Sequence, residues 1–181
     1  MRLVSIEGLG NMSIGMLAKE VGMSKSGLFA HFQSKEELQL AVLATTAARF
    51  TEKVVAPAVR KPRGRARLTA MFDGWIRWDA EEFPGGCVFY TVSSELDDRD
   101  GPVREHLVQS QRQLRGSIAR MVQDGIDSGQ VKSDADPDQF AFEVLGIVYS
   151  FIYHHRLLRD PFAVDRARTS FAALLDRIGA Q

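Results

Sequence analysis

The sequence has little of what several classes of protein need. Its 181 residues include one cysteine, Cys87, which excludes an intrachain disulfide and fits a reducing compartment. The longest apolar stretch, FAFEVLGIVYSFIY, is interrupted by Glu143 and is too short and too mixed to span a bilayer. The first ten residues lack a basic region followed by an apolar run, so no signal peptide is expected. These absences predict a cytoplasmic protein that does not enter a membrane.

Motifs of catalysis and metal binding are also missing. His154 and His155 are adjacent, so on a helix their side chains point about 100° apart and do not converge on a metal ion. There is no glycine-rich phosphate loop ending in Lys-Ser/Thr and no nucleophile elbow. The paired acids in SSELDDRD are typical of a solvated loop. We therefore expect no enzyme activity, no catalytic residue, no metal site and no cofactor.

Charge is balanced overall but unevenly distributed. The formal net charge is zero. Residues 1–67 hold 11 Lys and Arg against 5 Asp and Glu, a net charge of +6, and residues 68–181 carry the compensating −6. A basic N-terminal part on an acidic remainder favours contact between that part and a polyanion.

The apolar residues recur with helical spacing along nearly the whole chain, and no alternating strand pattern stands out. We predict an all-α fold of about nine helices. The first helix ends near Gly8 or Gly10. The others are expected at about residues 13–21, 25–32, 34–55, 65–82, 87–96, 102–128, 137–158 and 161–178. Pro57 is expected to end the fourth helix.

The second and third predicted helices have the spacing of a helix-turn-helix. Ala18 is small enough to let the two helices cross closely, and Gly22 tolerates the left-handed backbone of the turn. Ser24 can cap the following helix, and Leu28 is placed to anchor it. Leu17 and Val21 are expected on inner faces. The residues expected to face outward are Lys25, Ser26, Gly27 and Ala30.

The outward residues suit contact with DNA. In a helix-turn-helix, the start of the second helix meets base edges in the major groove. Lys25 can donate to guanine, Ser26 can donate or accept, and Gly27 lets the backbone approach closely. The helix starts at Ser13 and Ser34 offer free backbone N–H groups to phosphate. In the first turn of its helix Lys35 opposes the helix dipole, a misfit that a phosphate contact would explain.

Residues 17–38, LAKEVGMSKSGLFAHFQSKEEL, resemble the helix-turn-helix of the tetracycline-repressor (TetR) family of transcriptional regulators. The likeness covers about residues 5–45. The matching positions are Leu17, Ala18, Gly22, Met23, Ser24, Ser26, Gly27, Leu28, His31, Phe32, Ser34, Lys35 and Leu38. The remainder of the chain matches that family in helical layout and length.

The resemblance implies a three-helix DNA-binding domain at residues 1–45 and a helical-bundle ligand-binding and dimerisation domain at residues 46–181. Residues implied to contact DNA are Ser13, Ser24, Lys25, Ser26, Gly27, Phe29, His31 and Lys35. Among them, Lys25 and Ser26 would face bases, and His31 and Lys35 would lie at the phosphate backbone. Two departures stand out. Phe29 replaces the family's usual tyrosine, so the hydroxyl is lost while ring packing is expected to remain. The family also has more residues before this segment, which suggests a truncated start.

The resemblance further implies a small-molecule effector between the helices of the larger domain. Candidate ligand-binding residues are Trp75, Trp78, Cys87, Tyr90, His106, Met121, Tyr149 and Tyr153. Gly85-Gly86 is interpreted either as a helix terminator or as a hinge. Gly146 and Ser150, small residues four apart, would let a second copy approach. Candidate homodimer residues are Phe142, Gly146, Ser150, Phe171, Leu174, Leu175 and Ile178.

The sequence therefore predicts a homodimeric, ligand-responsive DNA-binding regulator, a repressor released from a palindromic operator by its effector. One alternative is a small-molecule-binding or catalytic helical bundle with a vestigial DNA-binding head. Another is a helical interaction protein without a cavity. The effector, the operator and the regulated genes do not follow from the residues.

Overall fold

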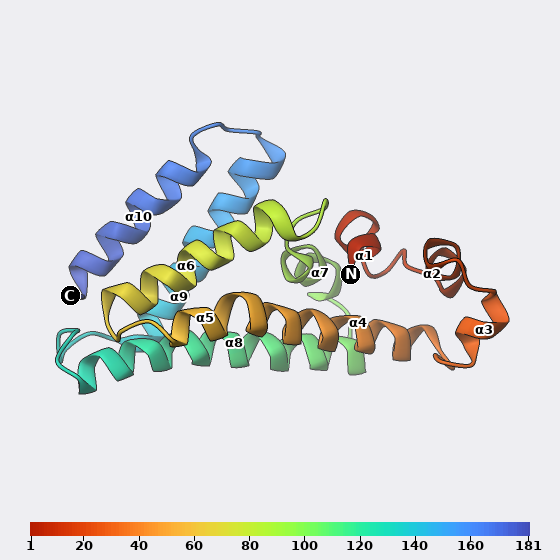
Figure 1. Cartoon of the computed structure of the whole chain (residues 1–181), viewed down its shortest axis with the longest axis horizontal. Helices are drawn as coiled ribbons and strands as arrows, with labels where there is room; N and C mark the ends of the chain where they lie inside the picture. The colour runs from red at the N-terminus through yellow and green to blue at the C-terminus, as the bar shows by residue number, and fades with distance from the viewer. The chain divides into compact units, whose positions relative to one another are not determined.

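The computed structural model describes all 181 residues, and its regular elements are all helical (Figure 1). The α-helices are α1 (Arg2–Glu7), α2 (Ile14–Val21), α3 (Lys25–Phe29), α4 (Lys35–Phe50), α5 (Ala56–Val59), α6 (Arg65–Arg77), α7 (Val88–Leu96), α8 (Pro102–Asp127), α9 (Pro137–Ile152) and α10 (Ala163–Arg177). Three wider π-helical turns are η1 (Thr51–Val55), η2 (Trp78–Glu82) and η3 (Tyr153–Leu157). The all-α prediction is confirmed. None of these helices combines the length and the apolar composition needed to cross a membrane.

The chain divides into two compact units. Unit 1 holds Met1–Arg49 and Glu81–Ser110, and unit 2 holds Phe50–Ala80 and Gln111–Gln181. Unit 1 therefore contains the predicted helix-turn-helix together with α7 and the start of α8. The predicted functional division at residues 45 and 46 stays a prediction, because it concerns roles rather than contacts.

The observed helices follow the predicted bounds closely, with two differences. Helical backbone continues from Thr51 through Pro57 to Val59. Proline has no N–H to donate, and its ring normally clashes with a carbonyl in the preceding turn. The wider turn of η1 immediately before Pro57 accommodates this defect. The other difference is α3, which ends at Phe29; beyond it the amide of His31 donates to the carbonyl of Leu28, three residues back, in a tighter turn.

Stacked aromatic rings fill the core of unit 2. Phe72 of α6 stacks on Phe171 of α10, with ring centroids 4.1 Å apart. Phe50 makes edge contacts with Trp75 and Trp78, at 5.4 and 5.2 Å between centroids. Such pairs add about 0.5–1.5 kcal/mol each beyond the area they bury. The face of α6 that carries Phe72 and Trp75 is therefore buried in the core.

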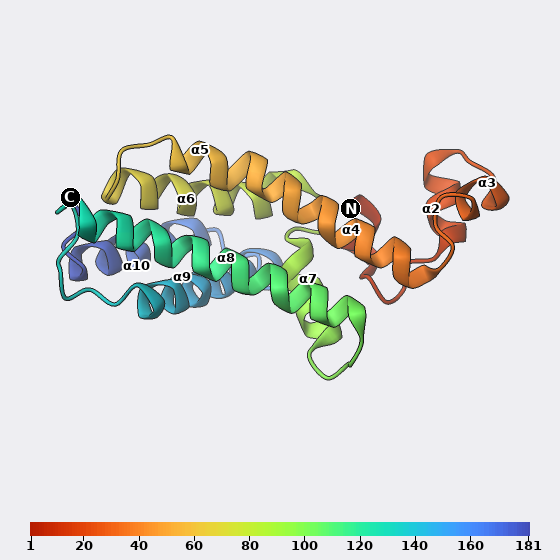
Figure 2. The ribbon, with the colours of Figure 1, turned by 90° about the horizontal axis from the view of Figure 1, so that it is seen from below.

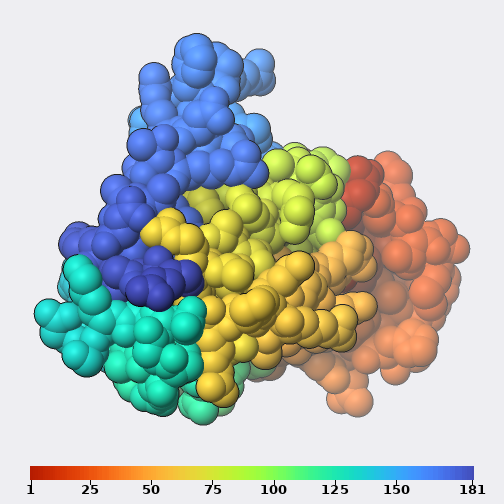
Figure 3. Space-filling model, turned by 60° about the vertical axis from the view of Figure 1, so that its left-hand side comes forward, coloured from red at the N-terminus to blue at the C-terminus, as the bar shows by residue number.

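Helices α9 and α10 lie side by side in unit 2 (Figures 1 and 2). Asp136 caps α9, accepting backbone bonds from Asp138 at 2.9 Å and Gln139 at 3.1 Å, and Pro137 occupies the first turn. In the space-filling view, the blue surface of the connection between α9 and α10 projects beyond the yellow surface of α6 (Figure 3). That connection holds the exposed side chains of Leu157, Leu158 and Phe162.

In unit 1, α1 packs against the chain around α7 with very little space between them. A Cβ added to Gly85 would lie 1.7 Å from the backbone oxygen of Ser5. The amide of Gly85 donates to the hydroxyl of Ser5 at 3.1 Å. Gly86 has φ 82, a left-handed backbone that suits the end of a helical segment. The sequence suggested that Gly85 and Gly86 end a helix or form a hinge. The structure shows in addition that the backbone of Gly85 lies against that of Ser5.

Replacing Gly85 by alanine is therefore expected to destabilise the protein. The obstructing atom belongs to the backbone and does not rotate away, so we expect a loss of about 1–3 kcal/mol or more in the free energy of unfolding. Gly116, on α8, is the matched control because an added Cβ meets nothing within 4 Å. Gly116→Ala should raise stability by about 0.5–1 kcal/mol. Urea unfolding of both variants measures the difference, and equal stabilities would contradict the close contact.

Candidate functional site

The turn between α2 and α3 has the geometry that the sequence predicts. Ser13 caps α2 by accepting from the amide of Met16 at 3.2 Å. Gly22 adopts φ 68 and ψ 25, the left-handed conformation. Ser24 then caps α3 by accepting from the amide of Gly27 at 3.0 Å. These local bonds fix where α3 begins and in which direction it leaves the turn.

The packing between α2 and α3 leaves one side of α3 exposed. Ala18 and Leu28 are buried, with 2% and 4% of their surfaces exposed. Val21, which we expected on an inner face, is 50% exposed. It has the helical phase of Ala18 but is the last residue of α2, where the chain turns away. The residues of α3 at its outer side are Lys25, Ser26, Phe29 and Ala30, all exposed.

Lys25 and Ser26, which were predicted to face DNA bases, are directed toward other parts of the chain. A Cβ placed on Gly15 would lie 3.0 Å from Cε of Lys25 and 3.5 Å from its Nζ. The lysine side chain therefore extends back over the first turn of α2. The hydroxyl of Ser26 lies 3.2 Å from that of Ser24, the capping residue.

The predicted contact His31 and the helix start at Ser34 both lie on the surface. His31 is exposed, so it is not the buried core histidine that is the common alternative. The hydroxyl of Ser34 accepts from the amide of Glu37 at 3.0 Å and caps α4. The carboxylate of Glu37 in turn accepts from the amide of Gln33 at 2.8 Å. Ser34 and Glu37 thus form a capping box in which the return bond goes to the amide of Gln33 instead of that of Ser34.

The peptide groups of Leu9 and Gly10 form a junction that the sequence analysis missed. The carboxylate of Glu95 on α7 accepts from their amides, at 3.1 Å for Leu9 and 2.7 Å for Gly10. From α4, Gln39 donates to the carbonyl of Leu9 at 3.0 Å, and the ammonium of Lys35 donates to the carbonyl of Gly10. This two-residue loop thereby ties α4 and α7 to the helix-turn-helix. No local pattern signals a bond between residues 85 positions apart.

The ammonium of Lys35 thus has a structural partner, which accounts for the residue's unfavourable position in the first turn of α4. An ammonium has three donors, so a contact with phosphate remains available to it. The sequence correctly indicated that Lys35 needs a partner to offset its unfavourable position in the helix, but it did not identify that partner.

The candidate ligand residues are divided between the two units. In unit 2, Trp75, Trp78 and Met121 are buried, whereas Tyr149 and Tyr153 are 37% and 45% exposed. In unit 1, Cys87 is buried, and Tyr90 and His106 are half-buried.

Two of these residues carry a buried polar atom without a hydrogen-bond partner: Nε1 of Trp75 and Nε2 of His106. Such atoms are uncommon in folded proteins and point to water or a ligand as the missing partner.

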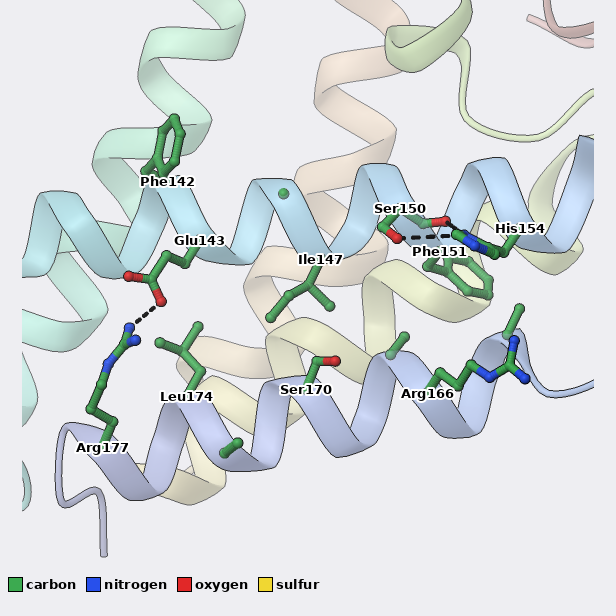
Figure 4. A pocket seen from close by; sticks show the side chains of 14 residues that line it. Phe142, Glu143, Ile147, Ser150, Phe151, His154, Arg166, Ser170, Leu174 and Arg177 are labelled. Carbon is green, nitrogen blue, oxygen red and sulfur yellow. Dashed lines mark hydrogen bonds and ion pairs between the residues drawn. The ribbon is translucent and has the colours of Figure 1, made fainter.

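A groove of about 700 Å³ lies between α9 and α10 in unit 2 (Figure 4). Ile147 and Leu174 point toward each other across it, from opposite helices. At one end, Arg177 forms an ion pair with Glu143. The hydrogen bond from Gln139 and then that from Arg177 hold the pKa of the Glu143 carboxyl below its ordinary value. The groove therefore has an apolar floor and a charged rim.

The candidate dimer residues fall into two groups. Phe142, Gly146 and Ser150 are exposed along α9 and line the groove. The remaining candidates are buried within the single chain: Phe171, Leu174, Leu175 and Ile178. Of these only Leu174 lines the groove. Phe171 instead takes part in the ring stack of the core, which its position on α10 did not reveal.

Comparison with known proteins places both parts of the chain in one family. The sequence profile described as "Bacterial regulatory proteins, tetR family" matches residues 1–42. The profile described as "Tetracyclin repressor-like, C-terminal domain" matches residues 64–171. No curated protein sequence matches.

Solved structures show the same fold over nearly the whole chain. A TetR transcriptional regulator from Chloroflexus aurantiacus is 24% identical, with 99% of this chain and 90% of that one covered and a TM-score of 0.86. AibR in complex with isovaleryl coenzyme A and operator DNA is 21% identical, with coverages of 93% and 91% and a TM-score of 0.70. FadR from Bacillus subtilis in complex with stearoyl-CoA is 13% identical, with coverages of 99% and 94% and a TM-score of 0.74.

Removing the carboxylate of Glu95 is expected to loosen the junction at Leu9 and Gly10. Glu95→Ala leaves both amides without their acceptor, and hydrogen bonds to a charged group contribute about 1.5–3 kcal/mol. The amides of Leu9 and Gly10 should exchange with deuterium faster, while the capped amide of Gly27 keeps its rate. Exchange rates measured by NMR test this. Unchanged rates at both amides would show that Glu95 does not hold the loop.

Proposed function

The chain belongs to the tetR family of bacterial regulatory proteins. From this premise we propose that it is a ligand-responsive, DNA-binding transcriptional regulator that acts as a homodimer, and specifically a repressor released from a palindromic operator by a small-molecule effector. The observation that carries this proposal is the exposed outer side of α3, held by the caps at Ser13 and Ser24. Two copies of α3 would enter successive major grooves.

Contacts with DNA phosphates would lie on both sides of α3, the helix proposed to enter the major groove. The first turn of α2 offers backbone N–H groups that Ser13 does not satisfy, and Lys25 extends over the same turn. We therefore assign Lys25 to a phosphate rather than to the guanine contact that its position in the sequence suggested. His31 and Lys35, both exposed, would hold the backbone from the other end of α3.

The groove between α9 and α10 would receive the second subunit. Along this face Phe142 is 69% exposed and Phe162 is 59% exposed. Phe142 lines the groove and Phe162 lies in the connection between its two helices, and exposed apolar side chains of this size mark an interaction surface. The small residues Gly146 and Ser150 leave room for a partner helix, and the apolar floor at Ile147 and Leu174 would be covered by it.

The effector would bind among the helices that follow residue 45. Within unit 2, the unpartnered indole nitrogen of Trp75 supports such a site, because a bound ligand satisfies groups that the protein leaves unpaired. Two relatives of the same fold hold acyl-coenzyme A ligands. Isovaleryl coenzyme A and stearoyl-CoA are therefore suitable first probes. By linkage, effector and operator would disfavour each other by the same factor, about 1–3 kcal/mol.

We place the protein in the cytoplasm, where its DNA target would lie, and assign it no catalytic step of its own. A binding or catalytic bundle with a vestigial head is the competing proposal. It differs in one respect that can be measured, because a vestigial head would show no sequence-selective, salt-dependent binding to duplex DNA.

Selection of bound duplexes from a random synthetic pool is the experiment that tests the proposed function. The full chain should recover a palindrome, since two identical heads meet two half-sites. Its affinity should fall steeply with salt because phosphate contacts release counterions. Recovery of no preferred duplex at low salt would favour the vestigial head.

The assignment of Lys25 to phosphate gives a second prediction. Lys25→Ala should weaken binding to all duplexes alike and reduce the slope of log Kd against log salt by about 1 for each half-site. The base preference of the selected duplexes should not change. Loss of preference at one base pair of the half-site, with the salt slope intact, would instead assign Lys25 to base reading.

Gly146→Glu should separate the subunits without unfolding either one. A Cβ added at Gly146 meets nothing within 4 Å in the single chain, but the carboxylate would be buried unpaired against the partner. We expect the dimer to weaken by about 3 kcal/mol or more. Gly116→Glu on α8, equally unobstructed, is the matched control and should remain dimeric. Sedimentation equilibrium distinguishes the two, and a dimer of unchanged affinity would exclude this face.

A further inference from the structure

The outer side of α3 exposes a large aromatic side chain. Phe29 is its largest exposed side chain, with 52% of its surface accessible. It lies one turn after Lys25, and Ala30 lies one turn after Ser26, so these four residues share the exposed arc of the helix. Phe29 falls near the middle of that arc. A groove that receives this side of α3 therefore meets an aromatic ring.

The two polar side chains of the same arc are directed toward other parts of the chain. The hydroxyl of Ser26 lies 3.2 Å from that of Ser24, whose oxygen already accepts from the amide of Gly27. The side chain of Lys25 runs back over Gly15 toward the start of α2. Gly27 and Ala30 have no side-chain donor or acceptor. Few groups remain on α3 that would read base edges by hydrogen bonds.

We propose that Phe29 reads the C5-methyl groups of thymines in the major groove, so that operator preference rests on apolar contact. The inference depends on the proposed function, which brings α3 to DNA. Among the base edges in the major groove, the thymine methyl is the only apolar group, and contact with phenylalanine is one of its recognised partners. Synthetic duplexes contain no methylated cytosine, so thymine alone supplies the methyl group there.

Replacing single thymines of the selected operator by deoxyuridine tests the inference, because this change removes the methyl group and keeps every hydrogen-bonding edge. At one or two positions of each half-site, Kd for the full chain should rise about fourfold per methyl group, the value of one buried carbon. Changing both half-sites together should raise it about fifteenfold. Unchanged Kd at every position would overturn the inference while leaving the proposed function standing.

Variants at Phe29 identify the residue responsible. Phe29→Ala should bind the thymine and uracil duplexes equally, and Phe29→Leu, which keeps an apolar side chain, should retain part of the difference. Val21→Ala is the matched control, because Val21 is similarly exposed but lies on α2. It should keep the wild-type ratio. Thermal unfolding confirms that the variants are folded. If Phe29→Ala kept the full thymine preference, another residue would be the reader.

Discussion

The packing of α3 on α2 is the contact on which the functional part of the molecule depends. A helix of five residues has no stability of its own in water, because nucleation costs more than so few hydrogen bonds return. Burial of Leu28, the left-handed turn at Gly22 and the cap from Ser24 supply what the helix lacks. Because these interactions use the inner side and the first turn, the opposite side of α3 is left free for a partner.

Unit 1 holds that arrangement in place through contacts between distant parts of the chain. Glu95 and Gly85, both near α7, meet the loop and helix that precede α2. Lys35 and Gln39 meet the same loop from α4. Helices α4 and α7 are therefore both hydrogen-bonded to the same two-residue loop, Leu9 and Gly10. Both helices are thus hydrogen-bonded to the backbone segment that leads into α2, and that segment contains none of the residues proposed to contact DNA.

Much of the fold was predictable because it follows local rules. Helix bounds, the caps at Ser13 and Ser24 and the turn at Gly22 depend on residues within four positions of one another. One local rule gave a wrong prediction. Pro57 does not end its helix, because the wider π-helical turn before it makes room for the proline ring.

The parts of the candidate site that could not be predicted depend on the tertiary structure. Glu95 and Lys35 lie 85 and 25 positions away from Gly10, to which both are hydrogen-bonded, and nothing in the sequence pairs them with it. The helical phase placed Val21 inside, but its position at the end of α2 left it exposed. Phe171 looked like an interface residue on α10, yet the ring of Phe72 covers it. Sequence spacing gives the direction of a side chain, and only the fold determines what lies opposite.

The central claim is that the outer side of α3 meets DNA, and oxidative footprinting of Phe29 tests it most directly. Hydroxyl radicals oxidise exposed aromatic rings, and Phe29 is half exposed in the free chain. Saturating the protein with its selected duplex should slow oxidation of Phe29 severalfold, while Trp75, buried in both states, reacts slowly throughout. An oxidation rate at Phe29 that is the same with and without bound duplex would contradict the account.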